Sequence, residues 1–219
     1  IAHTALWLPL ILVSIKSILE AGNKRQEIFW FFVLLISFSC SFLAGHLQTF
    51  FYISLLALIY MFTLWFTSGR KIIKLVPFLT VFILFITVTS IQWVPTLQLI
   101  DLSGRTEDQY VGAQGWFIPI QNLVQFVAPD YLGNPSTLNY YGIFNYGEFV
   151  GYVGIGGLLF ALSALFYRRD RKVIFYSVIF ALSIIFALQN AISMVPFQLK
   201  IPFISSAQPT RLLVLSCFS

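Results

Sequence analysis

Charge is what this sequence lacks most. Only 10% of its 219 residues are charged, against about 25% in an ordinary soluble domain. Such a composition excludes a soluble enzyme, a nucleic-acid-binding module and a disordered chain. Cysteine is also scarce: Cys40 and Cys217 both lie inside apolar runs, so no disulfide framework is expected. Apolar surface is abundant, with 58% hydrophobic residues and 24 Phe. The composition therefore predicts a chain whose partner is the lipid bilayer and not a nucleic acid.

The sequence also lacks the short motifs that mark familiar catalytic sites. A phosphate-binding Walker loop, a GxSxG serine motif, a CxxC pair and the spacings of metal ligands are all missing. No cofactor is therefore evident, and a requirement for a divalent metal stays open. The chain begins with Ile1 and stops within an apolar run, from which we expect a fragment of a longer protein.

Long apolar runs dominate what remains. A helix that crosses a bilayer needs about 20 apolar residues, and six stretches come close to that length. They cover residues 4–19, 28–44, 49–67, 75–99, 149–167 and 173–189, and a seventh opens at Arg211. We therefore predict an all-α fold, a polytopic transmembrane helical bundle that forms a single domain over residues 1–219.

Basic residues predict the orientation of this bundle. Nine of the thirteen Lys and Arg residues lie in the connections after the first, third and fifth stretches. Because cytoplasmic loops are enriched in Lys and Arg, these connections are expected inside and the other connections outside. The connection of residues 100–147 is then an extracytoplasmic loop of a multi-pass membrane protein.

The long outer loop carries the most informative polar residues. Apolar side chains recur at helical spacing over residues 115–128, which predicts an amphipathic helix on the outer headgroup layer or against the bundle. Five of the ten Tyr lie between residues 110 and 146. Tyr side chains at a membrane surface act as interfacial anchors or offer a stacking surface to a sugar. Both interpretations apply to Tyr141.

A few ionisable residues are expected at the outer mouth of the bundle. Glu148 begins the fifth stretch and is a candidate general base or a partner of the helix N-terminus. His46 and Gln48 lie in a tight turn, where His46 is a candidate catalyst or a hydrogen-bonded turn residue. Arg211 is a candidate phosphate ligand or an interface anchor. We expect Glu148, His46 and Arg211 to converge on one outward-facing cavity, because ionisable groups at a lipid boundary are costly unless they are paired or hydrated.

Several segments, in order, resemble the bacterial YfhO-like membrane protein family. The turn Ala44-Gly45-His46-Leu47-Gln48 resembles that family's Gly-His-Pro-Gln turn, with Leu47 in place of Pro. The similarity continues in segments that cover roughly residues 40 to 215: Gln92-Trp93-Val94-Pro95-Thr96, Ser103-Gly104-Arg105, Pro129-Asp130-Tyr131-Leu132-Gly133, Tyr141-Gly142, Glu148, Tyr152-Val153-Gly154 and Gln208-Pro209-Thr210-Arg211.

The resemblance implies a glycosyltransferase of the GT-C type in a bacterial cytoplasmic (inner) membrane. Such an enzyme moves a sugar from a polyprenyl-phosphate donor to a glycan or teichoic-acid-like acceptor on the outer face of the membrane. It implies catalytic roles for Glu148 and His46, and substrate binding by Arg211, Gln48, Asp130, Tyr141 and Arg105. The catalytic Asp that such enzymes carry in their first outer loop is expected upstream of this chain, so the fragment alone is expected to be inactive. A polytopic transporter or lipid flippase and a non-catalytic membrane assembly subunit remain alternatives.

Overall fold

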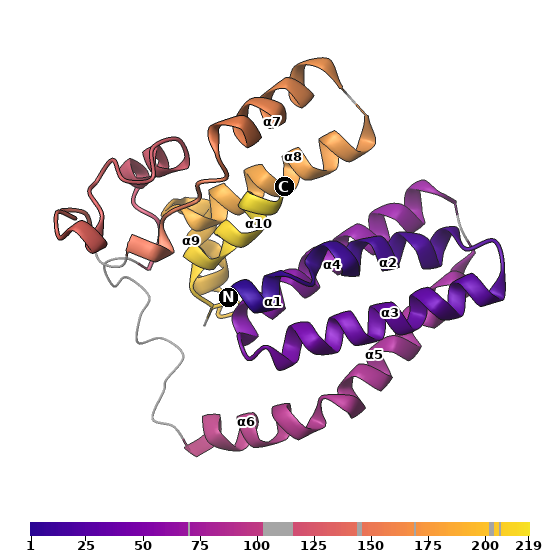
Figure 1. Cartoon of the computed structure of the whole chain (residues 1–219). Coiled ribbons are helices and arrows are strands. Elements are labelled where there is room, and N and C mark those ends of the chain that lie inside the picture. Colours follow the sequence, from indigo (N-terminus) through magenta and orange to yellow (C-terminus); the bar gives the residue numbers. More distant parts are fainter. Residues whose placement is uncertain (70, 103–115, 144–145, 169, 202–203, 206) are drawn as a thin grey trace. The chain divides into compact units, whose positions relative to one another are not determined.

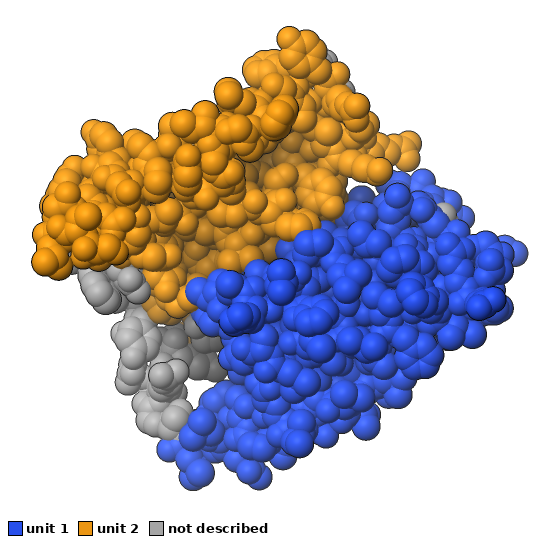
Figure 2. Space-filling view, viewed as in Figure 1, with its two compact units in different colours: residues 1–105 blue, residues 106–219 orange. Residues whose placement is uncertain are grey.

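The computed structural model describes residues 1–69, 71–102, 116–143, 146–168, 170–201, 204–205 and 207–219, without the side chain of Asp101. The chain divides into two compact units, Ile1–Arg105 and Thr106–Ser219 (Figures 1 and 2). The single domain that we expect over residues 1–219 stays a prediction. The polar 100–147 connection separates two sets of apolar helices, and each set buries its apolar faces against its own neighbours.

Unit 1 is built from helices that run back and forth. Its elements are α1 (Ala2–Ala5), α2 (Leu8–Glu20), α3 (Lys24–Leu43), α4 (Leu47–Thr67), the 3-10 turn η1 (Ile72–Leu75), α5 (Val76–Val88) and α6 (Ser90–Leu102). α2 packs against α3 and α4, and α3 packs against α5. Ile11, Ile18 and Ile53 are completely buried between them. A helix of 20 residues such as α3 measures about 30 Å, the thickness of a bilayer core.

Lysines from two connections of unit 1 form ion pairs with the same acidic residue, Glu27. Glu27 lies 3.2 Å from the ammonium nitrogen of Lys24 and 3.5 Å from that of Lys74. Lys74 also donates to the carbonyl of Ala21 at 3.5 Å. The connection after α2 and the connection after α4 therefore lie at the same end of unit 1, as alternating spans require.

The fourth predicted stretch, residues 75–99, is a bent pair of helices. Ile72–Val88 and Ser90–Ile100 meet at 65°. At the bend, the hydroxyl of Thr89 donates to the carbonyl of Phe85 and that of Ser90 to the carbonyl of Thr87. Hydroxyl groups that bond backbone carbonyls in this way compete with the helical ladder and bend it. Pro95, which lies inside α6, lacks the N–H of a continuous helix.

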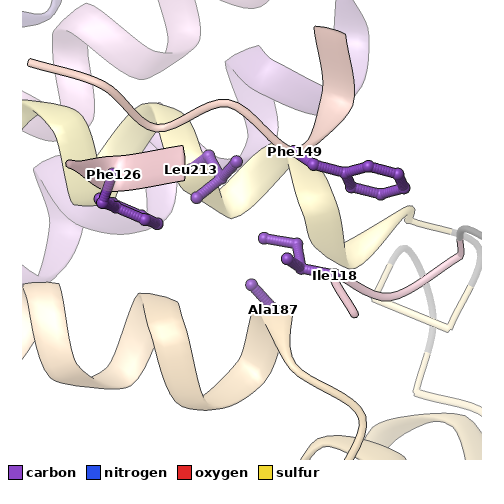
Figure 3. Packing of buried hydrophobic residues seen from close by; sticks show 5 residues of the cluster. All are labelled: Ile118, Phe126, Phe149, Ala187 and Leu213. Carbon is purple, nitrogen blue, oxygen red and sulfur yellow. The ribbon is translucent and has the colours of Figure 1, made fainter. Parts of the chain in front are cut away.

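Unit 2 combines short helices with a structured loop. Its elements are the 3-10 segments η2 (Ile120–Phe126), η3 (Pro135–Thr137) and η4 (Tyr146–Glu148), then α7 (Ile155–Tyr167), α8 (Arg171–Ala187), α9 (Ala191–Gln198), η5 (Pro209–Leu212) and α10 (Leu213–Phe218). Helix α8 packs against α7, α9, η5 and α10. The core cluster is formed by Ile118, Phe126, Phe149, Ala187 and Leu213 (Figure 3). These side chains come from the loop as well as from α8 and α10, so the loop is part of the folded unit.

Among the residues that the structure describes, three helices are long and apolar enough to cross a membrane: Ala2–Glu20, Lys24–Leu43 and Leu47–Thr67. The bent pair makes a fourth if it is one span. This is fewer than the six spans that we predicted. The fifth predicted stretch contains a helix of only 13 residues, α7. It starts late because Gly154 at its N-cap has φ +86°, a left-handed conformation that favours glycine.

The amphipathic helix predicted over 115–128 is also shorter than expected, and residue 115 lies outside the described residues. The segment forms the 3-10 helix η2, which follows an extended Pro119. Its polar Asn122 and Gln125 are buried, whereas Ile120 and Val127 are 68% and 58% exposed. A 3-10 helix has three residues per turn, so residues 122 and 125 share one face and turn it inward.

Candidate functional site

Two candidate residues form an ion pair in unit 2. The Oε1 atom of Glu148 lies 2.7 Å from the Nη2 atom of Arg211, with side chains only 13% and 19% exposed. The hydroxyl of Thr210 donates to the other carboxylate oxygen of Glu148 at 3.3 Å. A charge-assisted contact of this length is among the stronger polar interactions in proteins. The expected approach of Glu148 and Arg211 is therefore confirmed.

The two charged residues are each followed closely in the sequence by a residue buried in the core, which fixes their positions. Glu148 ends η4, and the next residue, Phe149, is completely buried in the core cluster. Arg211 lies in η5, which Pro209 opens, and Leu213 beyond it joins the same cluster. Because both segments are fixed by adjacent buried side chains, the ion pair sits at the edge of the core and is held from both sides.

A second cluster of polar side chains is centred on Asp130. Its Oδ1 atom accepts a hydrogen bond from the Tyr146 hydroxyl at 2.8 Å and from the Asn134 amide at 2.9 Å. The hydrogen bond to Asp130, with smaller contributions from burial and nearby charge, raises the pKa of Tyr146. Tyr146 begins η4 and Glu148 ends it, so this short segment is tied to Asp130 at one end and to Arg211 at the other.

Tyr140 connects this loop to η2. Its ring meets the ring of Tyr146 edge to face at 5.5 Å, and its hydroxyl donates to the carbonyl of Ile143. Burial raises the pKa of Tyr140, and a hydrogen bond from Asn122 partly offsets the rise. The loop is thus joined to the buried polar face of η2.

Sequence reasoning missed the buried amides of η2. The amide nitrogen of Asn122 donates to the Oε1 atom of Gln125 at 2.7 Å, and the amide of Gln125 donates to the carbonyl of Pro129 at 3.0 Å. The Oδ1 atom of Asn122 is buried and accepts no hydrogen bond from the described residues. An amphipathic α-helix over residues 115–128 would place these two amides on its polar face, away from the core. The i, i+3 spacing of Asn122 and Gln125 is the sequence signal for this shared face, because a 3-10 helix has three residues per turn.

An apolar cavity of about 500 Å³ lies between η2, α7 and α8. Phe126, Leu159 and Phe180 are among the side chains that line it. Phe126 also belongs to the core cluster that holds Phe149, the residue after Glu148. The cavity and the ion pair are therefore attached to the same core.

His46 and Gln48 belong to unit 1, whereas Glu148 and Arg211 belong to unit 2. His46 is the N-cap of α4, and its Nδ1 atom accepts a hydrogen bond from the backbone N–H of Thr49 at 3.2 Å. This is the hydrogen-bonded turn role that we had set beside catalysis. Gln48 is half-buried in the first turn of the same helix. A cavity shared by His46, Glu148 and Arg211 stays a prediction.

Two candidate residues remain, Tyr141 and Arg105, and the structure describes only Tyr141. The hydroxyl of Tyr141 donates to the carbonyl of Tyr131 at 2.9 Å, and its side chain is exposed. Arg105 lies outside the described residues. Within the described ranges, no three His, Cys, Asp or Glu side chains gather as metal ligands do.

In comparisons with known proteins, no family model, no curated protein and no solved structure matches this chain.

Proposed function

We propose that this chain is the membrane part of a GT-C-type glycosyltransferase, which moves a sugar from a polyprenyl-phosphate donor to a glycan or teichoic-acid-like acceptor. The single observation that carries the proposal is the ion pair of Glu148 and Arg211, 2.7 Å long and mostly shielded from water. A guanidinium fixed at the edge of an apolar core is a favourable ligand for a phosphate group. The resemblance described above supports the same reaction.

Each residue of the pair has its own role in this proposal. Arg211 binds the donor phosphate, because the planar guanidinium matches the geometry of a phosphate. Glu148 and the hydroxyl of Thr210 hold Arg211 in place and orient the acceptor. His46 supports the upstream catalytic Asp that the resemblance implies. The apolar cavity between η2, α7 and α8 accommodates part of the polyprenyl chain.

The proposal includes the finer topology of the chain. The bent pair α5–α6 forms the fourth span, and α7 and α8 complete the bundle with their connection in the cytoplasm. The loop of residues 100–147 and the ion pair then lie on the outer side of the cytoplasmic membrane. This is the side on which polyprenyl-phosphate sugars are consumed in such transferases.

Sugar transfer tests the proposal directly. The full-length protein is reconstituted in vesicles with a radiolabelled polyprenyl-phosphate sugar and a teichoic-acid-like acceptor, and labelled acceptor is counted. We expect transfer by the native protein and its loss in Arg211→Ala and Glu148→Gln. Glu20→Gln is the matched control, since Glu20 lies in an exposed pair 3.8 Å from Lys16. Absence of transfer with a range of donors, despite correct folding, would count against the proposal.

A second candidate function is that of a transporter or lipid flippase. The bend of 65° between α5 and α6 supports it, because broken helices line the substrate sites of many transporters. The two candidates differ in a measurement: a transporter moves substrate across vesicles without any covalent transfer. Uptake that Thr89→Ala reduces and Arg211→Ala leaves unchanged would favour the transporter.

A further inference from the structure

The loop of residues 130–141 carries an apolar tip. Leu138 is 94% exposed, and Tyr131 and Tyr141 are 62% and 71% exposed. No charged residue lies between Asp130 and Glu148 in the sequence. Large apolar side chains at nearly full exposure in an uncharged segment mark a surface that meets a partner.

Leu138, at the tip of the loop, has a backbone conformation that leucine rarely adopts. It has φ +57° and ψ +23°, a left-handed conformation that ends η3. Left-handed backbone is unfavourable for an ordinary L-residue and is adopted readily by Gly and Asn. Leu at this position therefore weakens the loop and exposes its methyl groups.

The loop keeps its shape through internal hydrogen bonds. The side chain of Asn139 accepts bonds from the backbone N–H of Asn134 at 2.8 Å and from the hydroxyl of Thr137 at 2.7 Å. The N–H of Tyr141 donates to the carbonyl of Leu132 at 3.1 Å. Bonds that close within the loop lower the cost of taking it out of water, because unsatisfied backbone groups are what a membrane disfavours most.

Gly133 lets the two sides of the loop touch. It has φ +81°, and a Cβ atom on it would lie 2.2 Å from the carbonyl oxygen of Asn139. The Tyr141 hydroxyl, bonded to the carbonyl of Tyr131, closes the loop a second time. The two exposed tyrosines are therefore neighbours on a stiff support.

We propose that the 130–141 loop is a membrane anchor: Leu138 inserts among the lipid headgroups and upper acyl chains, and Tyr131 and Tyr141 lie at the headgroup level. Tyr rings favour this level because one end is apolar and the other forms hydrogen bonds. The partner is the bilayer that the spanning helices of unit 1 already require. A sugar would use polar side chains of the loop, but those of Asp130 and Asn139 are engaged within it, and it would gain nothing from Leu138. The anchor does not depend on the proposed glycosyl transfer.

Spin-label accessibility tests the anchor. In the full chain with Cys40→Ala and Cys217→Ala, Leu138→Cys is spin-labelled and reconstituted into vesicles of phosphatidylcholine and phosphatidylglycerol. We expect more collisions with oxygen, which concentrates in the bilayer, than with a water-soluble nickel chelate. Leu58→Cys on α4 is the lipid reference and Arg168→Cys the water reference. A label at 138 that behaves like the one at 168 would overturn the proposal.

A second label separates anchoring from folding. With the label at Ser136→Cys, Leu138→Asn is expected to raise nickel accessibility severalfold, because Asn suits the left-handed backbone but does not insert. Leu138→Met, which keeps an apolar side chain, is the matched control and is expected to leave the accessibility unchanged. Equal nickel accessibility in the Asn and Met variants would contradict the anchor. Loss of acceptor binding in Tyr141→Ala together with a water-exposed label at 138 would replace it with a sugar-binding surface.

Discussion

At the scale of single residues, the pair of Glu148 and Arg211 is the most consequential contact in unit 2. Removing two charges from water costs several kcal/mol per ion, which their attraction repays only with good geometry and further hydrogen bonds. Here the 2.7 Å contact and the bond from Thr210 supply both. Loss of one partner leaves the other charge shielded and uncompensated.

Glu148→Gln is therefore expected to lower the free energy of unfolding by about 2–4 kcal/mol, close to the range for breaking a buried pair. The measurement is denaturant unfolding in detergent micelles, followed by circular dichroism. Glu20→Gln, in the exposed pair with Lys16, is expected to cost less than about 1 kcal/mol. The double variant Glu148→Leu with Arg211→Met should recover most of the loss, because it removes both charges. Equal effects of Glu148→Gln and Glu20→Gln would show that the pair contributes little.

Gly133 offers a second residue-level prediction. Gly133→Ala forces a side chain into left-handed backbone, which alone costs about 1–2 kcal/mol, and places its Cβ against the carbonyl of Asn139. We expect faster hydrogen exchange of the amides of residues 132–141. Gly147→Ala is the control, since a Cβ there meets nothing within 4 Å, and its exchange should match the native protein. Unchanged exchange in Gly133→Ala would mean that the loop is already open.

At the scale of elements, side chains next to the break between α5 and α6 account for the bend. The hydroxyls of Thr89 and Ser90 bond carbonyls of the preceding turn. The indole N–H of Trp93 donates to the carbonyl of Ile86 at 2.9 Å, bridging the bend. These three side chains replace part of the backbone ladder at the break.

Removal of the two hydroxyls is expected to straighten this pair. In Thr89→Ala with Ser90→Ala, labels at Leu79 and Leu99 should move apart by about 5 Å, since two ten-residue arms span roughly 30 Å when collinear and about 25 Å at the observed 65°. Pulsed electron resonance on the doubly labelled chain measures this distance. Both positions are exposed, so the labels themselves are tolerated. An unchanged distance would assign the bend to Pro95 or to packing against α3.

The sequence allowed the long helices to be predicted because their signals are strong. α3 has an Asn23 cap that accepts from the N–H of Gln26 and an apolar run from Ile28 to Ile36, and α4 begins after the His46 cap. The approach of Glu148 and Arg211 was predictable from the cost of isolated charges near lipid. Where competing signals exist, prediction failed: Gly154 shortens α7, and Pro119 with the three-residue period of η2 reverses the face that we expected. The division into two units depends on packing that no local pattern encodes.

At the scale of the whole molecule, charge and helix direction agree within unit 1. Lys24 and Lys74 share Glu27, so the ends of two connections predicted to be cytoplasmic are neighbours. The connection between α3 and α4, Ala44–His46, contains no Lys or Arg. In unit 2, Arg168 follows α7, and Arg171 and Lys172 begin α8, in a connection that is also predicted to be cytoplasmic.

Cysteine labelling with an impermeant reagent tests this topology in intact cells. In a Cys40→Ala and Cys217→Ala background, Tyr141→Cys is expected to react from outside, whereas Lys24→Cys and Arg168→Cys should react only after lysis. The reason is the excess of Lys and Arg in cytoplasmic loops. Ala44→Cys in unit 1 is likewise expected to react from outside. Labelling of Arg168→Cys in unbroken cells would invert the orientation and move Glu148 and Arg211 to the cytoplasmic side.

The short length of α7 has a consequence for the membrane itself. Its 13 residues measure about 20 Å, while the hydrocarbon layer is about 30 Å thick. Most of its large side chains are exposed, among them Leu159, Phe160 and Phe166. In the proposed topology such a helix creates hydrophobic mismatch, which a bilayer relieves by thinning around it. Short-chain lipids would then gather beside unit 2.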